Sequence, residues 1–350
     1  MSVSENALML SLLGAPALLY GAAVKLRLRL YALPGLARRA DLPVISVGNL
    51  TVGGTGKTTI VAWLVFELER RGRRPAVVSR GYLGRAGRGP VIVSRGQGPL
   101  VAPEISGDEP FLLANRLPGA VVVAGSDRVV GCEAALQAGA DCVVLDDGFQ
   151  HLRLARDLDI VLLDAHNPFG NYRLLPAGTL REPVSGLGRA GAVVITRSRP
   201  GESFAVVERV VRRYNATVPL LRAGHRWSGF VNAGGDLVER PARAVAFCGI
   251  GNPQVFVTDL EQQGVHVAEF RAFRDHHPFT AADWAGLRES AARHQATLLT
   301  TEKDLVRLRA FVRGDERPPV MALRIEAAVH DAEPLLALVE AALRRTGAAS

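Results

Sequence analysis

Residues 42–59 carry the feature that most constrains this chain: an apolar segment, a glycine-rich loop and the start of a helical pattern, in that order. The loop reads Gly48-Asn-Leu-Thr-Val-Gly-Gly-Thr-Gly-Lys-Thr58. A loop of this kind between a strand and a helix wraps backbone N–H groups around phosphate oxygens. Its lysine reaches the β- and γ-phosphates, and its threonine hydroxyl ligates Mg²⁺. We therefore predict a site for a nucleoside triphosphate made by Thr51, Val52, Gly53, Gly54, Thr55, Gly56, Lys57 and Thr58.

The loop departs from the usual phosphate-loop pattern at one position. The pattern G-x-x-x-x-G-K-[ST] requires a glycine five residues before Gly56, and this chain has Thr51 there. Gly53 and Gly54 still supply flexible backbone. The competing interpretation is a glycine-rich turn in an unrelated α/β domain, and the adjoining Gly56-Lys-Thr58 argues against it.

The rest of the chain alternates between strand-like and helical patterns. Continuous apolar runs separated by helices predict a parallel sheet that is covered on both faces. Active sites of such sheets lie beyond the carboxyl ends of the strands. An extended hairpin or linker is expected from about residue 219 to 239, and a second, smaller α/β alternation follows it. The predicted organisation is a hydrophobic segment at 1–33, a P-loop domain at 34–218, and the hairpin with a smaller α/β domain at 219–350.

Composition narrows the class of protein and of partner. The chain has 350 residues, is 48% hydrophobic and carries a net charge of +8, which suits a packed globular protein with anionic partners. Its three cysteines are widely spaced, so we expect neither a disulfide framework nor a zinc site, and a reducing compartment fits best. No recognition-helix or aromatic–basic pattern favours nucleic acid.

The N-terminal segment has the composition of a membrane-associated helix. Residues 7–24 are uncharged and would span roughly 27 Å as a helix, near the thickness of a bilayer core. Lys25, Arg27 and Arg29 follow, and such a flank stays on the cytoplasmic side. Gly14 and Pro16 interrupt the run, so the helix either crosses the membrane or lies in its interface. A hydrophobic helix buried against the domain is the third possibility.

Several charged groups follow predicted strands. Asp146 and Asp147 end an apolar strand, where a P-loop enzyme holds Mg²⁺ directly or through water. Asp108 opens a helix, and it is interpreted either as an N-cap or as a general base near the phosphate loop. Arg128 and Arg181 follow other turns and would neutralise charge on a transferred phosphoryl group. The run Asp275-His276-His277-Pro278 is either a metal pair or a helix cap.

Taken in order, these motifs resemble those of the tetraacyldisaccharide 4′-kinase family, the lipid A 4′-kinases of Gram-negative bacteria. The resemblance covers nearly the whole chain, and the missing early glycine is also a feature of that family. Thr59 stands where the family often has proline. The motifs are residues 48–58, Ser79-Arg-Gly-Tyr82, Gly107-Asp-Glu-Pro110, Asp127-Arg128, Asp146-Asp-Gly-Phe-Gln-His151, Leu175-Pro-Ala-Gly-Thr-Leu-Arg-Glu-Pro183, Phe247-Cys-Gly-Ile-Gly-Asn-Pro253, Asp275-His276 and Thr301-Glu-Lys-Asp304.

The resemblance implies ATP-dependent phosphorylation of the 4′-hydroxyl of a tetraacylated glucosamine disaccharide 1-phosphate, which gives lipid IV-A. It implies Mg²⁺, attachment to the cytoplasmic face of the inner membrane, and two α/β domains joined by a β-ribbon with the site in the cleft. It implies no obligate protein partner. By the same resemblance Asp108 is the base with His276 as its partner, and Thr58, Asp146, Asp147 and Glu182 lie near metal and nucleotide. Arg80, Tyr82, Arg128, Gln150, His151 and Arg181 are expected to face phosphate or the acceptor.

Two switch proteins remain as alternatives. The run Gly53-Gly-Thr-Gly-Lys-Thr-Thr59 also resembles the loops of membrane-associated partitioning-type ATPases, which use an extra lysine early in the loop. This chain has Leu50, Thr51 and Val52 at the preceding positions. A GTP-dependent switch would need an Asn/Thr-Lys-x-Asp motif, of which Thr301-Glu-Lys-Asp304 is a partial imitation without the required spacing.

Overall fold

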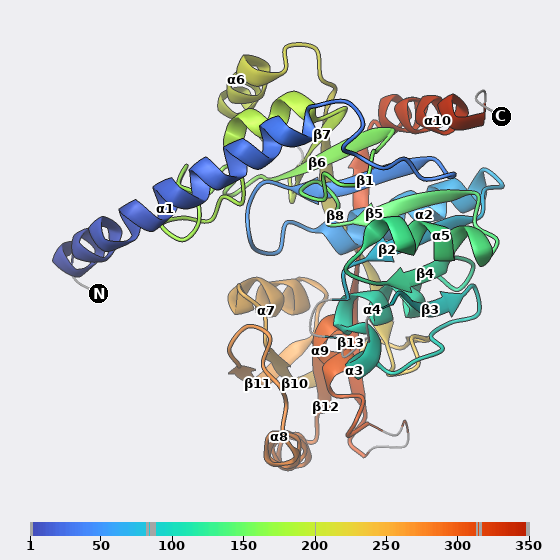
Figure 1. Ribbon diagram of the computed structural model, residues 1–350. Helices are drawn as coiled ribbons and strands as arrows, with labels where there is room; N and C mark the ends of the chain where they lie inside the picture. Colours follow the sequence, from blue (N-terminus) through green and yellow to red (C-terminus); the bar gives the residue numbers. More distant parts are fainter. Residues whose placement is uncertain are drawn as a thin grey trace.

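One continuous mixed sheet of 13 strands runs through the whole molecule in the computed structural model (Figure 1). The structure describes residues 3–81, 84, 89–199, 201–312, 314 and 317–347, with backbone only for residues 3–12 and 345–347. The strand order is β11-β10-β12-β13-β8-β7-β6-β1-β5-β2-β4-β3, and β9 pairs with β8. Two bodies are visible along this sheet, and both are built from strands that alternate with helices.

The first body is the predicted parallel sheet with helices on both faces. Neighbouring residues of a strand face opposite sides, so Ile45 of β1 packs in one core cluster and Val44 in another. The strands are β1 (Val44–Asn49), β2 (Pro75–Ser79), β3 (Val91–Arg95), β4 (Val121–Ala124), β5 (Cys142–Asp146), β6 (Leu158–Asp164) and β7 (Ala192–Thr196). The helices are α2 (Lys57–Arg70), α3 (Pro103–Ser106), α4 (Asp108–Arg116), α5 (Arg128–Gln137), the 3₁₀-helix η1 (Val184–Arg189) and α6 (Ala205–Tyr214).

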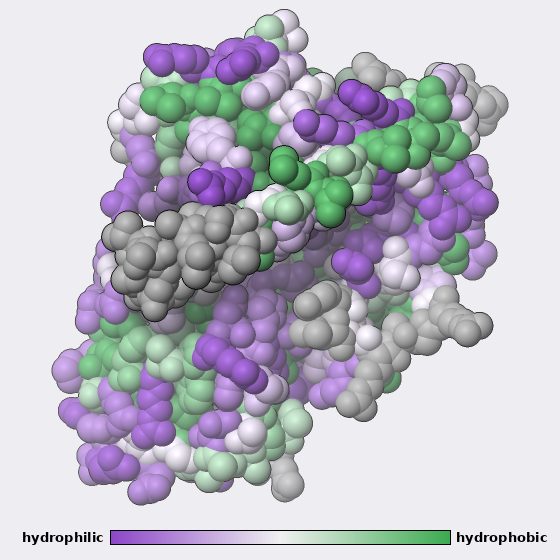
Figure 2. Space-filling model, turned by 60° about the vertical axis from the view of Figure 1, so that its left-hand side comes forward, coloured by the Kyte–Doolittle hydropathy of each residue, from purple (hydrophilic) through white to green (hydrophobic). Residues whose placement is uncertain are grey.

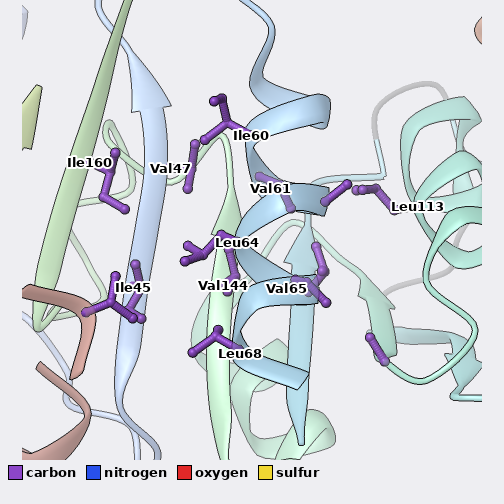
Figure 3. Close-up of a cluster of buried hydrophobic side chains, with 14 of the residues drawn as sticks. Ile45, Val47, Ile60, Val61, Leu64, Val65, Leu68, Leu113, Val144 and Ile160 are labelled. Atoms are coloured by element: carbon purple, nitrogen blue, oxygen red, sulfur yellow. The ribbon is translucent and has the colours of Figure 1, made fainter. Parts of the chain in front are cut away.

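Helix α2, which follows the glycine-rich loop, is fixed by the largest core cluster. Ile60, Leu64 and Leu68 lie at helical spacing on its buried face and point toward Val47 and Val144 of the sheet (Figure 3). Leu113 of α4 lies on the other side of the helix. Because α2 is packed along its length, the loop at its N-terminus has a rigid base.

The second body contains the predicted ribbon and a smaller α/β unit. The long strands β8 and β13 pair in antiparallel register, from Ala322 opposite Val231 to His330 opposite Arg222. The second body's elements are β8 (Leu220–Val231), β9 (Leu237–Val238), β10 (Arg243–Cys248), α7 (Pro253–Gln262), β11 (His266–Ala272), α8 (Ala281–Arg293), β12 (Thr297–Thr301), α9 (Glu302–Arg307) and β13 (Val320–His330). Helix α10 (Glu333–Gly347) follows β13 and packs on the first body.

Two features of the fold differ from the predicted organisation. Strand β3 pairs with β4 in antiparallel register at the edge of the otherwise parallel sheet. Helix α10 belongs to the C-terminal segment by sequence, but its Leu335 and Val339 complete the core of the first body beside β1 and β6.

The N-terminal helix α1 (Val3–Tyr31) projects beyond the first body (Figure 1). Its Tyr20 hydroxyl donates a hydrogen bond to the carbonyl oxygen of Arg181 at 2.7 Å, and Gly21 lies against Leu174, so its C-terminal half is docked. Leu18, Leu19 and Leu26 remain between 59% and 77% exposed. Within the part of the chain that the structure describes, no helix meets the length and apolarity needed to cross a membrane.

We predict that truncating Leu335 destabilises the protein although it lies near the end of the chain. Leu335 is fully buried in the cluster that supports α2 and β1, so Leu335→Ala should cost about 2–5 kcal/mol of unfolding free energy. Urea denaturation followed by circular dichroism measures the loss. Leu237→Ala, at a side chain that is 66% exposed, is the matched control, and an equal effect of both variants would contradict this packing.

Candidate active site

The root of the glycine-rich loop is packed directly against the Asp146–Phe149 turn. A Cβ atom on Gly48 would lie 2.6 Å from Cβ and 2.9 Å from N of Phe149, so only glycine fits at this position of β1. Phe149 is fully buried. The parallel pairing of β1 with β5, with Val47 opposite Asp146, brings the loop and the two carboxylates to the same edge of the sheet.

The irregular Thr51 has a structural explanation. Thr51 pairs with Leu180 as an isolated bridge, and the Val52 N–H donates to the Thr179 carbonyl at 2.8 Å. The chain at this point is extended and paired, so a glycine is not needed to turn it. Thr51 is 7% exposed and does not line the cleft described below, which differs from its expected place in the nucleotide site.

The remaining loop residues have the geometry of a phosphate cradle. Gly56 is the N-cap of α2 and has a left-handed φ of 76°, which non-glycine residues adopt only with strain. The Thr196 hydroxyl donates to the Thr55 carbonyl at 2.9 Å, and the Arg197 guanidinium donates to the Gly54 carbonyl. These contacts hold the loop's carbonyls on the side of β7. Amide groups at this helix N-terminus are therefore preorganised for an anion.

Asn49 is a site residue that the sequence reasoning did not identify. It is fully buried at the end of β1; its amide donates to the Thr55 hydroxyl at 3.0 Å, and its Oδ1 accepts from Lys57 Nζ at 3.2 Å. The Gln150 amide donates to the Asn49 carbonyl at 2.8 Å. The signal available in the sequence was an asparagine at the end of a largely apolar segment, where burial demands hydrogen-bond partners.

Asp146 and Asp147 occupy different electrostatic environments. Burial, reinforced by the nearby Glu109 and Asp147 carboxylates, raises the pKa of Asp146, and a Ser79 hydroxyl at 3.1 Å and Lys57 oppose that shift. Burial also acts on Asp147, but Lys57 at 3.6 Å and Arg181 at 2.6 Å outweigh it and hold its pKa below the usual value. The pKa values of these two adjacent carboxyl groups thus shift in opposite directions because their side chains have different neighbours.

The donors available at this edge fit a magnesium ion held in part by a nucleotide. Asp147 Oδ1 is buried without a hydrogen-bond partner, and the Thr58 hydroxyl lies on the first turn of α2. Among the described residues, no group of three or more His, Cys, Asp or Glu side chains is arranged to hold a metal. Magnesium bound by one or two carboxylates, a hydroxyl and phosphate oxygens needs no such group.

Residues 181–182 form one wall of the site. Glu182 is buried, and its two oxygens accept hydrogen bonds from Gln150 and from Arg189, each at 2.8 Å. This carboxylate, expected near the metal, is therefore satisfied by protein groups. Arg181 pairs with Asp147 and is tied by its carbonyl to Tyr20 of α1.

The opposite wall joins the two bodies of the molecule through α4 and α9. Asp108 does not cap α4. The N-cap residue is Gly107, and no side chain makes a capping hydrogen bond at this helix end in the described structure. Its Oδ2 accepts instead from Arg307 Nε at 2.7 Å. Glu109 pairs with Lys303 at 2.6 Å; burial opposes its ionisation, but the ammonium outweighs burial and lowers its pKa.

His276 lies on the second body and reaches the same guanidinium. Arg307 Nη2 is 2.9 Å from His276 Nδ1, and within the described part of the chain no hydrogen bond joins Asp108 and His276 directly. The neighbouring His277 has a structural role, because it contacts Asp283 of the Thr280–Asp283 capping box of α8 at 3.1 Å. The N-cap of α8 is Thr280, so His277 supports the capping box through Asp283 and does not itself cap the helix.

A cleft of about 1500 Å³ collects most of the predicted residues from both bodies. Figure 2 shows a hollow with hydrophilic walls below the described, partly hydrophobic surface of α1. Tyr20, Val24, Arg27 and Leu28 of α1 also line the cleft. The predicted residues on its wall are Val52, Gly53, Gly54, Thr55, Gly56, Lys57, Thr58, Arg80, Asp108, Asp147, Gln150, Arg181, Glu182 and His276.

Besides Thr51, three predicted residues lie away from the cleft wall. Asp146 is buried behind Asp147. Arg128 is 3% exposed and donates to the Gly125 carbonyl at 2.8 Å rather than facing the cleft. His151 is half-buried beside Arg128; burial, with a contribution from that charge, lowers its pKa to about 4. Tyr82 lies outside the described residues.

Comparison with known proteins identifies similar sequences over nearly the full length. The family model described as tetraacyldisaccharide-1-P 4′-kinase matches residues 9–344. Tetraacyldisaccharide 4′-kinases of Geobacter sulfurreducens and Halorhodospira halophila are 42% and 43% identical, covering 95% and 89% of this chain and 93% and 88% of their own. A crystal structure of LpxK from Aquifex aeolicus in complex with ATP is 34% identical, has a TM-score of 0.78, and is matched over 96% of this chain and 99% of that one.

We predict that Asn49→Ala weakens ATP binding while the protein stays folded. The substitution removes an acceptor of the Lys57 ammonium and a donor to Thr55, and hydrogen bonds to charged groups contribute about 1.5–3 kcal/mol. We therefore expect the dissociation constant for ATP to rise by roughly 10- to 100-fold, measured by titration calorimetry. Asn232→Ala, in a turn that does not line the cleft, is the control. Unchanged affinity in the Asn49 variant would contradict the assignment.

Proposed function

The chain belongs to the tetraacyldisaccharide-1-P 4′-kinase family, and on this premise we propose how its residues perform that reaction. The activity is transfer of a phosphoryl group from ATP to the 4′-hydroxyl of a tetraacyldisaccharide 1-phosphate in lipid A biosynthesis. One observation carries the proposal: the phosphate loop, the Asp108 carboxylate and helix α1 line a single cleft. Nucleotide, proton acceptor and a surface for an acylated substrate thereby meet in one place.

In this proposal the side chains and amides of the chain bind the triphosphate, orient the reacting groups and deprotonate the acceptor hydroxyl. The amides of residues 53–58 and the Lys57 ammonium hold the triphosphate, and Lys57 is oriented for this by Asn49. Arg181 neutralises charge at the cleft wall, held beside Asp147. Asp108 accepts the proton of the 4′-hydroxyl as the phosphoryl group is transferred. Arg80 and Gln150 on the wall are proposed to contact the acceptor.

Magnesium is part of the proposal because the available donors suit it. Thr58 and the Asp146–Asp147 strand end would hold the ion, and when bound it supplies positive charge to the phosphate oxygens. Glu182 is proposed to support this site indirectly, since Gln150 and Arg189 occupy its oxygens.

The proposed location is the cytoplasmic face of the inner membrane, with α1 as the contact. Three features of α1 support this: exposed leucines, the basic residues Lys25, Arg27 and Arg29, and its place along the cleft. Exposed apolar side chains followed by cations favour contact with a membrane surface, where the cations meet anionic headgroups. The acyl chains of the substrate would then stay in the membrane while its sugar enters the cleft.

The family matches do not favour the alternative of a partitioning-type ATPase switch. Such a switch hydrolyses ATP without a lipid acceptor. An assay with labelled ATP and the disaccharide lipid, separated by thin-layer chromatography, distinguishes the two because only the kinase moves the label to lipid.

We predict that Asp108→Asn lowers turnover by about 10²–10⁴-fold, in the usual range for loss of a general base. The change keeps the size of the side chain, so the Michaelis constant for ATP should change little. The acceptor assay measures both quantities. Glu104→Gln, at an exposed acid of the adjacent helix α3, is the control and should keep full turnover. A folded Asp108→Asn protein with near-native turnover would contradict the role of this carboxylate.

We predict that replacing Leu18, Leu19 and Leu26 by serine weakens vesicle binding by at least about 10-fold. Burial of a leucine side chain contributes roughly 1.5–3 kcal/mol, and all three are exposed on α1. Co-sedimentation with vesicles of phosphatidylethanolamine and phosphatidylglycerol measures binding. The double variant Val206→Ser/Leu237→Ser removes exposed apolar side chains elsewhere and should bind like the wild type. Equal binding by all three proteins would exclude α1 as the membrane contact.

A further inference from the structure

Arg307 is the one side chain that contacts both Asp108 and His276 in the described part of the chain. Its Nε donates to Asp108 Oδ2 at 2.7 Å, and its Nη2 lies 2.9 Å from His276 Nδ1. The Arg307 side chain is 8% exposed, whereas Asp108 and His276 are 25% and 48% exposed, so a buried cation reaches two groups that are open to the cleft. Arg307 comes from α9 of the second body and Asp108 from α4 of the first, so the contact joins the two bodies at the reacting carboxylate.

A fully buried acid fixes the orientation of this guanidinium. Asp304 Oδ1 accepts from Arg307 Nη1 at 2.8 Å, and its Oδ2 accepts from the Gly249 N–H at 2.9 Å and the Thr301 hydroxyl at 2.8 Å. Arg307 Nη1 also reaches the Gly249 carbonyl at 3.3 Å. With every one of its nitrogens engaged, the guanidinium presents a fixed fork to Asp108 and His276.

The contact with Arg307 sets the hydrogen-bonding role of His276 Nδ1. A guanidinium carries only donors, so His276 Nδ1 is the acceptor of this hydrogen bond. The other ring nitrogen, Nε2, lies 3.9 Å from Asp275 Oδ1. The backbone of His276 has a φ of 58°, and its N–H donates to the Gly249 carbonyl at 3.2 Å, so the ring is held in place by the same turn.

We propose that Arg307 is a positioning residue for phosphoryl transfer. It holds Asp108 through Oδ2, which leaves Oδ1 to accept the proton of the acceptor hydroxyl, and it keeps His276 in the Nε2–H tautomer. The catalytic pair is therefore linked through a cation instead of by a direct bond, and it is assembled only while α4 and α9 are in contact. This inference rests on the proposed role of Asp108 as the base.

Other contacts hold α4 against α9, so the role of Arg307 is separable from docking. Arg116 forms an ion pair with Glu302, and both side chains are less than 10% exposed. Glu109 pairs with Lys303. Arg309, in the turn after α9, places its guanidinium 4.7 Å from the ring centre of Phe111 on α4. Loss of Arg307 leaves all three contacts in place.

The test is Arg307→Met, which keeps the length of the side chain and removes its donors. We expect turnover to fall about 10²-fold, the scale expected when a reacting group is misplaced by about 1 Å, with the Michaelis constant for ATP within about 3-fold of wild type. Arg307→Lys should recover part of the loss, since it keeps the charge at Asp108 without the fork. Arg309→Met is the matched control and should keep wild-type turnover. Unchanged or increased turnover in Arg307→Met would overturn the proposal.

Two further measurements separate this proposal from the one on which it rests. In the Asp108→Asn background, adding Arg307→Met should cause no further loss of residual turnover, because the two residues act as a unit. Full additivity of the two losses would overturn the positioning role, whereas an active Asp108→Asn protein would overturn the role of the base itself. Nitrogen NMR of labelled histidine should report an unprotonated Nδ1 for His276 in the wild type, and a protonated Nδ1 would contradict the contact.

Discussion

The antiparallel pairing of β8 with β13 is the constraint on which the arrangement of the site depends. It makes one sheet of two α/β bodies, and its long register fixes how the second body faces the phosphate loop. Helix α9 directly follows β12, the neighbour of β13, so the pairing also determines where Lys303 and Arg307 meet α4. Strand β8 leads from the first body into the second, and β13 leads back to α10, which packs in the core of the first body. The two bodies therefore share one sheet, and the chain passes from the first body to the second and back again.

The charges in the cleft are balanced across this arrangement. Asp147 is compensated by Lys57 and Arg181 of its own body, while Asp108 and Glu109 are compensated by Arg307 and Lys303 of the other. Asp146 has no such cation in direct contact among the described residues and accepts a hydrogen bond from the Ser79 hydroxyl. The Lys303 ammonium of the second body lowers the pKa of Glu109, so the second body helps to keep this acid of α4 ionised. Electrostatics thus favours the same contact of α4 with α9 that the ribbon permits.

Local sequence patterns predicted most elements, because apolar periodicity and helix-start residues act over short distances. The apolar segment before the glycine-rich loop and the helix after it were predicted, and they form β1 and the start of α2. Local patterns do not predict which strands and helices pack against one another. The antiparallel β3, the place of α10 and the pairing of Thr51 with Leu180 all depend on contacts between residues distant in sequence. The phosphate loop and the Asp146–Asp147 turn could be recognised from short motifs, whereas Asn49 and Arg307 acquire their roles only through partners brought by the fold.

Arg307 shows why a residue whose role depends on distant partners cannot be recognised from the sequence. In a chain with so many arginines, no local pattern distinguishes the one at this position, and α9 is too short to show helical periodicity. Its spacing from Lys303 places both cations on one face of a helix, which becomes meaningful only when Asp108 and Glu109 are known to lie opposite. Two adjacent acids on α4 and two cations one turn apart on α9 form complementary pairs, each of which requires the other half of the molecule. The loop that opens α2 is held by contacts within the first body, but the carboxylate proposed to accept the proton is oriented only when both bodies contribute to the site.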